Sequence, residues 1–268
     1  MEKIKVGFIG CGNMGGALAR AVAKSGLCEI LLADVDIKKA QILAEKTGGT
    51  VVTAEQIATE AKYIFLGVKP QMMAELIDGI VDCLKGRSDR FILVTMAAGI
   101  KIASFNNMLN AKMPMIRIMP NTPVAVGEGM VLYSLCRAIT DEEEKEFLKL
   151  LEFSGKLDRL EEELIDAGCV VSGCGPAFVY MFAEGIAKAG VELGLSSEQS
   201  IKYAAQTLLG AAKLMQTSGK TPEDLRIEVC SPKGSTIEGV MSLQNSDFDE
   251  NINAALKASY KRTKELGK

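Results

Sequence analysis

The feature that most constrains the fold is a run of three spaced glycines, which directly follows the apolar segment Ile4–Ile9 and opens a helical segment, Ala17–Lys24. In such a turn the first glycine permits the tight bend. The second lets the backbone approach a pyrophosphate, and the third lets helix and strand pack closely. Free N–H groups at the helix N-terminus favour an anion. We therefore predict a dinucleotide site here, with a plain glycine turn of a flavodoxin-like fold as the alternative. The predicted cofactor-binding residues are Gly10, Cys11, Gly12, Asn13, Met14 and Gly15.

Strand-like and helical segments alternate through the first half of the chain. The apolar runs Glu29–Ala33, Tyr63–Val68 and Phe91–Thr95 are separated by helical patterns, which is typical of βαβ units and a parallel sheet. Further strands are predicted at Met115–Met119, Met130–Leu135 and Lys156–Leu160. From Glu161 onward the strand-like runs disappear. We predict an α/β fold, with a Rossmann-like dinucleotide-binding domain at 1–160 and an all-α domain at 161–268 that packs on itself or on a partner.

Polar or small residues follow several of the predicted strands. Asp34 ends the second strand 24 residues after Gly10, where an acidic residue binds the ribose hydroxyls of NAD. The segments 67–70 and 96–99 follow two later strands, and the carboxyl ends of strands line the ligand crevice of an open α/β sheet. Ordinary strand-to-helix turns and helix packing are the alternatives. The further predicted cofactor-binding residues are Asp34, Gly67, Val68, Lys69, Pro70, Met96, Ala97 and Ala98.

Two stiff polar loops are candidates for substrate binding. The segment Arg117–Pro123 holds two prolines and can present Asn121, although a rigid turn at a domain edge explains it equally well. The segment Ser231–Thr236 places Ser235 and Thr236 at a helix N-terminus, where free N–H groups and the helix dipole favour a carboxylate. Ordinary helix capping is the alternative there.

Composition excludes several classes of protein. The chain contains no histidine, so a Ser-His or Cys-His nucleophile and a His-ligated zinc are impossible, and we expect no metal. A net charge of −3 argues against nucleic-acid binding. Seven cysteines without CxxC spacing fit reduced thiols. The N-terminal segment does not resemble a signal peptide, and no stretch approaches 18 apolar residues. We expect a cytoplasmic protein with no membrane partner.

Taken together, these segments resemble the pyrroline-5-carboxylate reductase family. The resemblance spans essentially the whole chain and is carried, in order, by GCGNMG (10–15), GVKP (67–70), MAAGI (96–100), RIMPNTP (117–123), SGCGPAF (172–178), CSPKGSTIEG (230–239) and KRTKEL (261–266). Two residues depart from the family pattern. Cys174 stands where serine is usual, and Lys233 stands where glycine is usual.

The resemblance implies an oxidoreductase that transfers a hydride from NADPH or NADH to the C=N bond of 1-pyrroline-5-carboxylate, giving L-proline in the last step of proline biosynthesis. It also implies that the helical domain interleaves with a second subunit in a homodimer, and that dimers assemble into a larger ring. Thr236 is then the catalytic residue, hydrogen-bonding the ring nitrogen directly or through a water. The implied substrate-binding residues are Ser235, Thr236, Gly234, Glu162 and Asn121.

The chemistry agrees with this resemblance, because a cyclic imine can be protonated before the hydride arrives and no histidine acid is needed. The coenzyme depends on Asp34-Val35-Asp36, whose carboxylates repel a 2′-phosphate, although Lys38 and Lys39 follow. We predict that NADH serves at least as well as NADPH. Two alternatives remain, a β-hydroxyacid dehydrogenase and a cofactor-sensing regulator. The first needs a lysine beside a small-residue loop, and Lys188 lies some way after Gly175.

Overall fold

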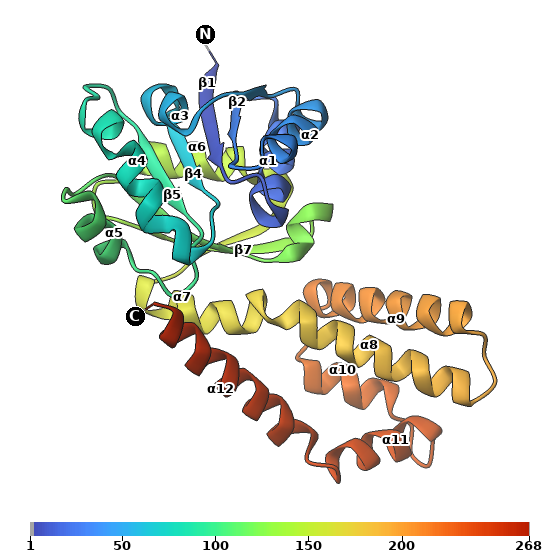
Figure 1. The fold of residues 1–268 in the computed structure, drawn as a ribbon. Helices are drawn as coiled ribbons and strands as arrows, with labels where there is room; N and C mark the ends of the chain where they lie inside the picture. Colours follow the sequence, from blue (N-terminus) through green and yellow to red (C-terminus); the bar gives the residue numbers. More distant parts are fainter. Residues whose placement is uncertain (1–2, 268) are drawn as a thin grey trace. The chain divides into compact units, whose positions relative to one another are not determined.

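The computed structural model describes residues 3–267 (Figure 1). Two compact units are present. The first comprises the chain up to Cys174 and again from Ser259, and the second comprises Gly175–Ala258. The last helix therefore contributes residues to both units.

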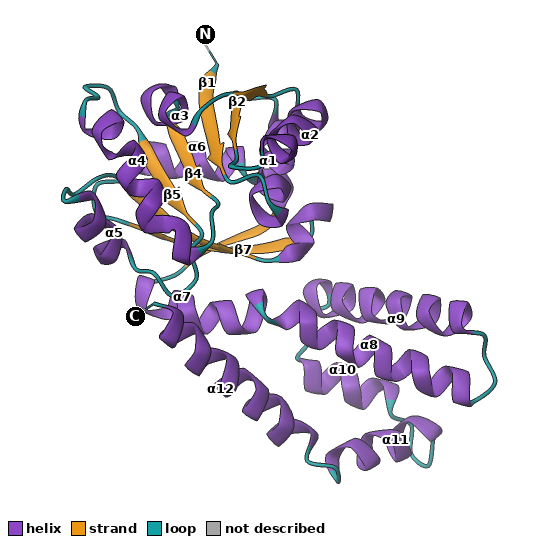
Figure 2. Cartoon of the chain, viewed as in Figure 1, coloured by secondary structure: helices purple, strands orange, loops and turns teal. Residues whose placement is uncertain are grey.

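The first unit is built on one eight-stranded sheet with the order β3-β2-β1-β4-β5-β6-β7-β8 (Figure 2). The strands β1 to β6 pair in parallel, β6 and β7 pair antiparallel, and β7 and β8 are parallel again. The strands are β1 (Ile4–Ile9), β2 (Cys28–Ala33), β3 (Thr50–Val51), β4 (Tyr63–Leu66), β5 (Ile92–Thr95), β6 (Met115–Pro120), β7 (Gly129–Leu135) and β8 (Gly155–Arg159). This arrangement confirms the predicted Rossmann-like α/β fold.

Helices connect the strands and then make up the rest of the chain. The α-helices of the sheet region are α1 (Asn13–Ser25), α2 (Ile37–Thr47), α3 (Ala54–Glu60), α4 (Met73–Lys85), α5 (Ile102–Leu109) and α6 (Asp141–Leu150), with 3-10 turns η1 (Pro70–Met72), η2 (Thr122–Val126) and η3 (Glu152–Ser154). The later helices are α7 (Glu162–Gly168), the π-helix η4 (Cys169–Gly173), α8 (Gly175–Glu192), α9 (Ser197–Thr217), α10 (Pro222–Val229), α11 (Ser235–Gln244) and α12 (Phe248–Leu266).

The sheet is buried on both faces, as expected for parallel strands covered by crossover helices. One core cluster joins the sheet to α1, α2 and α6, and the other joins it to α3, α4 and α5 (Figure 1). Phe8 and Phe65 stack with ring centroids 4.5 Å apart within the first cluster. Because the central strands β1, β4 and β5 are held from both sides, the loops at their carboxyl ends lie on a rigid base.

Several structural details differ from the sequence interpretation. The strands at 115–120 and 129–135 run antiparallel, because the eight-residue connection between them is too short for a parallel crossover. The helix α5 was not predicted. The helix after the Thr140 capping box ends at Leu150 and gives way to η3, rather than continuing to residue 154. The first helix begins at Asn13, immediately after the glycine turn.

The predicted domain boundary at residue 160 differs from the division into compact units, which falls after Cys174. The intervening segment packs on the sheet, since Ile165 and Cys169 share a small core cluster with Met119 and Leu132. The segment Glu162–Glu192 is also long and apolar enough to cross a membrane by length and composition, since an 18-residue window within it has a mean hydropathy of 1.4. The expectation that no stretch approaches a membrane span was therefore wrong.

Within the second unit, α8 and α9 lie side by side (Figure 1). Few side chains of these helices are buried, and large apolar ones stand exposed, including Met181 of α8 at 73% and Ile201 of α9 at 59%. An apolar helix surface of this kind needs a covering partner.

Candidate active site

The glycine turn between β1 and α1 has the geometry that its sequence requires. Gly10 has a φ of 106°, and a Cβ atom on it would lie 2.6 Å from the backbone carbon of Gly67. A Cβ atom on Gly15 would lie 2.1 Å from the carbonyl oxygen of Gly10, so only glycine allows this close approach of helix and strand. A Cβ atom on Gly12 would meet no atom within 4 Å. Gly12 therefore borders open space where a ligand can approach the backbone.

The N-terminus of α1 offers uncapped backbone donors. Gly12 is the N-cap residue, so no side chain accepts a hydrogen bond there, and the first turn contains no acidic residue. The first N–H groups of a helix have no intrahelical partner, and the helix dipole adds partial positive charge. This end of α1 is thus suited to an anionic group such as a pyrophosphate.

A cavity of about 660 Å³ runs along the carboxyl ends of β1, β2 and β4. Six of the predicted cofactor residues line it, namely Gly10, Gly12, Asp34, Gly67, Val68 and Lys69. The rest of its wall is largely apolar, and its volume is in the range of small-molecule sites. The structure thus brings the glycine turn, the acidic residue after β2 and the loop after β4 into one groove.

Asp34 is fixed within this groove by two backbone donors. Its carboxylate accepts hydrogen bonds from the N–H of Cys11 at 2.7 Å and from the N–H of Asp36 at 2.8 Å. Burial, followed by the neighbouring Asp34 carboxylate, raises the pKa of the Cys11 thiol to about 12, so this thiol is neutral at physiological pH. The Cys11 thiol donates to the carbonyl of Ala33 at 3.5 Å.

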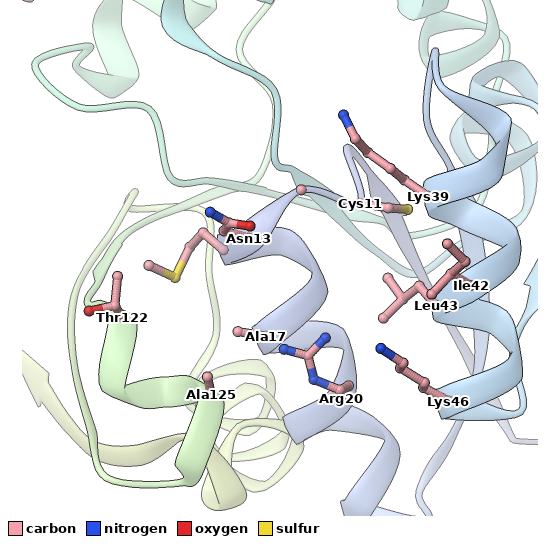
Figure 3. A pocket seen from close by; sticks show the side chains of 12 residues that line it. Cys11, Asn13, Ala17, Arg20, Lys39, Ile42, Leu43, Lys46, Thr122 and Ala125 are labelled. Atoms are coloured by element: carbon pink, nitrogen blue, oxygen red, sulfur yellow. The ribbon is translucent and has the colours of Figure 1, made fainter. Parts of the chain in front are cut away.

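A second cavity, of about 500 Å³, adjoins the first at Gly12 and Lys39 and lies between α1, α2 and η2 (Figure 3). Cys11, Asn13 and Met14 line it together with the basic residues Arg20, Lys39 and Lys46. No acidic residue is in this lining, so the electrostatic potential here is positive. The sequence interpretation gave no role to Arg20 or Lys46.

The remaining cofactor residues lie at the same edge of the sheet without lining either cavity. Pro70 begins η1, and the segment 96–98 follows β5, with Ala97 buried and its two neighbours half-buried. Gly15 lies beneath the turn. Among the described residues, no group of three potential ligands lies close enough together to hold a metal ion.

Two predicted substrate residues have side chains that are used within the protein. The Asn121 side chain is 8% exposed, donates to the carbonyl of Ser172 at 3.0 Å and accepts from the N–H of Met130 at 2.9 Å. Glu162 accepts from the N–H of Ile102 at 2.7 Å. Both side chains therefore hold loops together in this structure.

A buried charged cluster around Arg117, in the middle of β6, was not predicted from the sequence. The fully buried guanidinium of Arg117 binds Asp166 at 2.5 Å and lies 3.6 Å from Glu162, and Lys264 binds the other oxygen of Asp166 at 3.1 Å. The sequence contains one indication of it, an arginine inside the otherwise apolar strand 115–120, because a buried arginine needs a carboxylate partner.

The predicted catalytic residue Thr236 and the predicted substrate-binding residues Ser235 and Gly234 belong to the second unit. Ser235 and Thr236 are the first two residues of α11, both are exposed, and Gly234 is the N-cap residue without a side-chain hydrogen bond. Lys233 adopts a φ of 61°, which explains why glycine suits this position. The N–H of Gly234 closes the turn on the carbonyl of Ser231 at 3.0 Å. The uncapped start of α11 thus presents hydroxyl and N–H donors together.

Comparisons with known proteins cover the whole chain. The family model for pyrroline-5-carboxylate reductase dimerisation matches residues 162–266, and the model for NADP oxidoreductase, coenzyme F420-dependent, matches residues 5–99. Pyrroline-5-carboxylate reductase 3 of Danio rerio is 37% identical, covering 99% of this chain and 92% of that protein. Pyrroline-5-carboxylate reductase of Escherichia coli K12 is 34% identical, and both chains are covered completely.

Solved structures agree with these relatives. The NADP-bound pyrroline carboxylate reductase of Plasmodium falciparum has a TM-score of 0.88 and 28% identity, covering 99% of this chain and all of that one. The pyrroline-5-carboxylate reductase of Coxiella burnetii has a TM-score of 0.89 and 26% identity, covering 98% of each chain.

Proposed function

The chain belongs to the pyrroline-5-carboxylate reductase family, and from that premise we propose which residues carry the reaction and which coenzyme they take. It is an NAD(P)H-dependent oxidoreductase that reduces the C=N bond of 1-pyrroline-5-carboxylate to give L-proline, the last step of proline biosynthesis. The observation that carries the residue assignment is the pair of uncapped helix N-termini, one at the coenzyme groove and one at Ser235.

The residues of the groove fit a nicotinamide dinucleotide. The open space at Gly12 admits the pyrophosphate, and the start of α1 supplies its N–H donors. Asp34 supplies acceptors for ribose hydroxyls. When bound, the coenzyme supplies a hydride to the imine carbon.

We assign the substrate carboxylate to the start of α11. The N–H groups of Ser235 and Thr236 and the Ser235 hydroxyl favour an anion there, and the Thr236 hydroxyl hydrogen-bonds the ring nitrogen. The nitrogen is protonated before hydride transfer, so hydride addition to the iminium carbon gives a neutral secondary amine without a further proton transfer, and the chain needs no imidazole acid. Alignment of two rings by such contacts accounts for much of the barrier.

Substitution of Thr236 tests this assignment. Thr236→Val removes the hydroxyl and keeps the shape, so we expect kcat to fall roughly 100-fold, within the range for a lost catalytic hydrogen-bonding group. Thr236→Ser retains the hydroxyl and should retain most of the activity. Ser104→Ala, in α5 and outside the site, is the matched control, and its kcat should stay within about twofold of the wild-type value. Equal losses in the Thr236→Val and Ser104→Ala variants would remove Thr236 from the mechanism.

For the coenzyme, we propose that NADH serves at least as well as NADPH. Asp34 is held at the groove by two backbone N–H groups and cannot turn away without losing both hydrogen bonds, so its charge stays where a 2′-phosphate would approach. Lys39 lines both cavities, and its positive charge counteracts the repulsion between Asp34 and a 2′-phosphate. Its ammonium lies 3.8 Å from Asp36, which offsets part of that charge.

Asp34→Asn tests the coenzyme proposal. We expect the ratio of kcat/KM for NADPH to that for NADH to rise roughly tenfold, because a repulsion with the 2′-phosphate is removed. Glu29→Gln removes a charge from an exposed position on β2 and serves as the control. A wild-type protein that turns over NADPH as fast as NADH at far lower concentration would refute the proposal.

The helical part of the chain is a dimerisation domain, which accounts for the exposed apolar side chains of α8 and for the apolar stretch Glu162–Glu192. We propose that these faces are covered by a second copy, and that dimers assemble into a larger ring. Light scattering at several protein concentrations tests both statements. A cytoplasmic location stays a prediction, supported by seven free cysteines.

A further inference from the structure

The end of α12 is packed directly against the loop 96–100 that follows β5. A Cβ atom on Gly267 would lie 2.1 Å from the carbonyl oxygen of Gly99, and one on Gly99 would lie 2.7 Å from the backbone nitrogen of Gly267. Gly99 has a φ of 76°, in the left-handed region that favours glycine. Two backbones therefore meet here with no room for a side chain on either.

A second contact fixes the same turn of α12. Lys264 donates to Asp166 at 3.1 Å, and Asp166 in turn binds the buried Arg117 of β6 at 2.5 Å. The Asp166 side chain is only 3% exposed, whereas the Lys264 side chain is 40% exposed. Hydrogen bonding to Asp166 raises the pKa of Lys264, so this lysine is charged throughout the physiological range.

The other side of the loop is held by α7. Glu162 accepts from the N–H of Ile102, the first residue of α5 and two residues beyond the loop, and Ala98 packs against the cluster that contains Ile165. Arg117, Lys264, Glu162 and Asp166 together carry two positive and two negative charges, so the cluster is neutral as a whole. The loop is thus clamped between α7 and the last turn of α12, and neither element belongs to the dinucleotide groove.

We propose that Lys264 and Gly267 are positioning residues for the loop 96–100, setting where it meets the nicotinamide half of the coenzyme. This inference rests on the proposed function together with the prediction from the sequence that Met96, Ala97 and Ala98 bind the coenzyme. α12 also begins in the second unit, at Phe248, and ends in the first. The helix that carries the clamp therefore starts among the elements that hold Ser235 and Thr236.

Two ligands, ADP-ribose and NADH, distinguish binding of the adenosine half of the coenzyme from binding of its nicotinamide half. ADP-ribose binds the glycine turn and Asp34 but lacks the nicotinamide, whereas NADH engages the loop as well. Isothermal titration with both compounds is expected to show that Gly267→Ala and Lys264→Met weaken NADH binding roughly tenfold, about the loss of one hydrogen-bonded contact with the nicotinamide half, while the affinity for ADP-ribose changes by less than about twofold. The same variants should lower kcat/KM for NADH in parallel.

Two further variants of α12 serve as controls for Lys264→Met. Lys264→Arg retains the charge and the donor and should restore wild-type affinity for NADH. Lys261→Met, on the same helix at an exposed position with no ion pair described, should leave both affinities unchanged. Equal weakening of NADH and ADP-ribose by Lys264→Met, or wild-type NADH affinity in both Gly267→Ala and Lys264→Met, would overturn the inference. A wild-type protein that binds neither compound would instead contradict the proposed function.

Discussion

Removing the carboxylate of Asp166 should destabilise the first unit strongly. Arg117 is fully buried, and its Nη2 atom donates to Asp166 at 2.5 Å. Its Nε and Nη1 atoms have no hydrogen-bond partner, and Nη1 lies 3.6 Å from Glu162. Asp166→Ala therefore leaves this cluster with one positive charge in excess and Arg117 with only the longer contact to Glu162, which costs about 3–5 kcal/mol.

This loss is a large fraction of the total free energy of unfolding of a domain, which is about 5–15 kcal/mol. At about 2–4 °C per kcal/mol for a protein of this size, the melting temperature should fall by roughly 6–20 °C. Thermal and urea unfolding, followed by circular dichroism, measure the change. Lys264→Met is the comparison, and it should cost at most about 1 kcal/mol because the lysine is partly exposed.

A double variant distinguishes lost charge pairing from lost packing. Arg117→Met with Asp166→Leu replaces the ion pair by apolar groups, and such replacements are often neutral or stabilising. We expect its free energy of unfolding to lie within about 2 kcal/mol of the wild type, well above that of Asp166→Ala. A loss below about 1 kcal/mol in Asp166→Ala, or a double variant as unstable as the single one, would refute this reasoning.

Further predictions concern the glycine turn and acid stability. Gly12→Ala should weaken NADH binding about tenfold and leave stability within about 0.5 kcal/mol, because its methyl group meets no protein atom but enters the coenzyme's space. Gly15→Ala, by contrast, should lower the free energy of unfolding by about 1–3 kcal/mol, because its methyl group would collide with the Gly10 carbonyl. Urea unfolding of the two variants measures this difference in stability. Hydrogen bonding to Arg90 lowers the pKa of Glu143 below its ordinary 4.5. Glu143 therefore stabilises the fold fully above about pH 4.5, and this contribution is lost as the pH falls through the lowered pKa. Glu143→Gln should be less stable than the wild type at pH 7, and unfolding curves should converge in acid; a gap that is constant with pH would contradict the assignment.

Local patterns in the sequence predicted residues that the structure brings together in one groove. The roles of Gly10, Gly12 and Gly15 depend on steric rules that act within a few residues. Asp34 and Gly67 follow neighbouring strands, and the carboxyl ends of parallel strands meet at one edge of the sheet, so both residues lie beside the glycine turn. These statements need only the order of strands, which the alternation of apolar runs and helices specifies.

Contacts between distant segments could not be predicted in the same way. Arg117 meets a carboxylate 49 residues later, and Lys264 reaches that same carboxylate from a separation of 98 residues. The amide of Asn121 is satisfied by backbone groups of two different segments, so its polarity alone did not indicate whether it faces a ligand. The close approach of Gly99 and Gly267 likewise depends on where α12 ends.

The central claim is tested most directly by incubating the purified protein with 1-pyrroline-5-carboxylate and either NADH or NADPH. Loss of reduced-nicotinamide absorbance and formation of L-proline are followed together. We predict that one L-proline is formed for each coenzyme oxidised, with NADH at least as effective as NADPH. A protein that binds NADH but oxidises neither coenzyme in the presence of this substrate would contradict it.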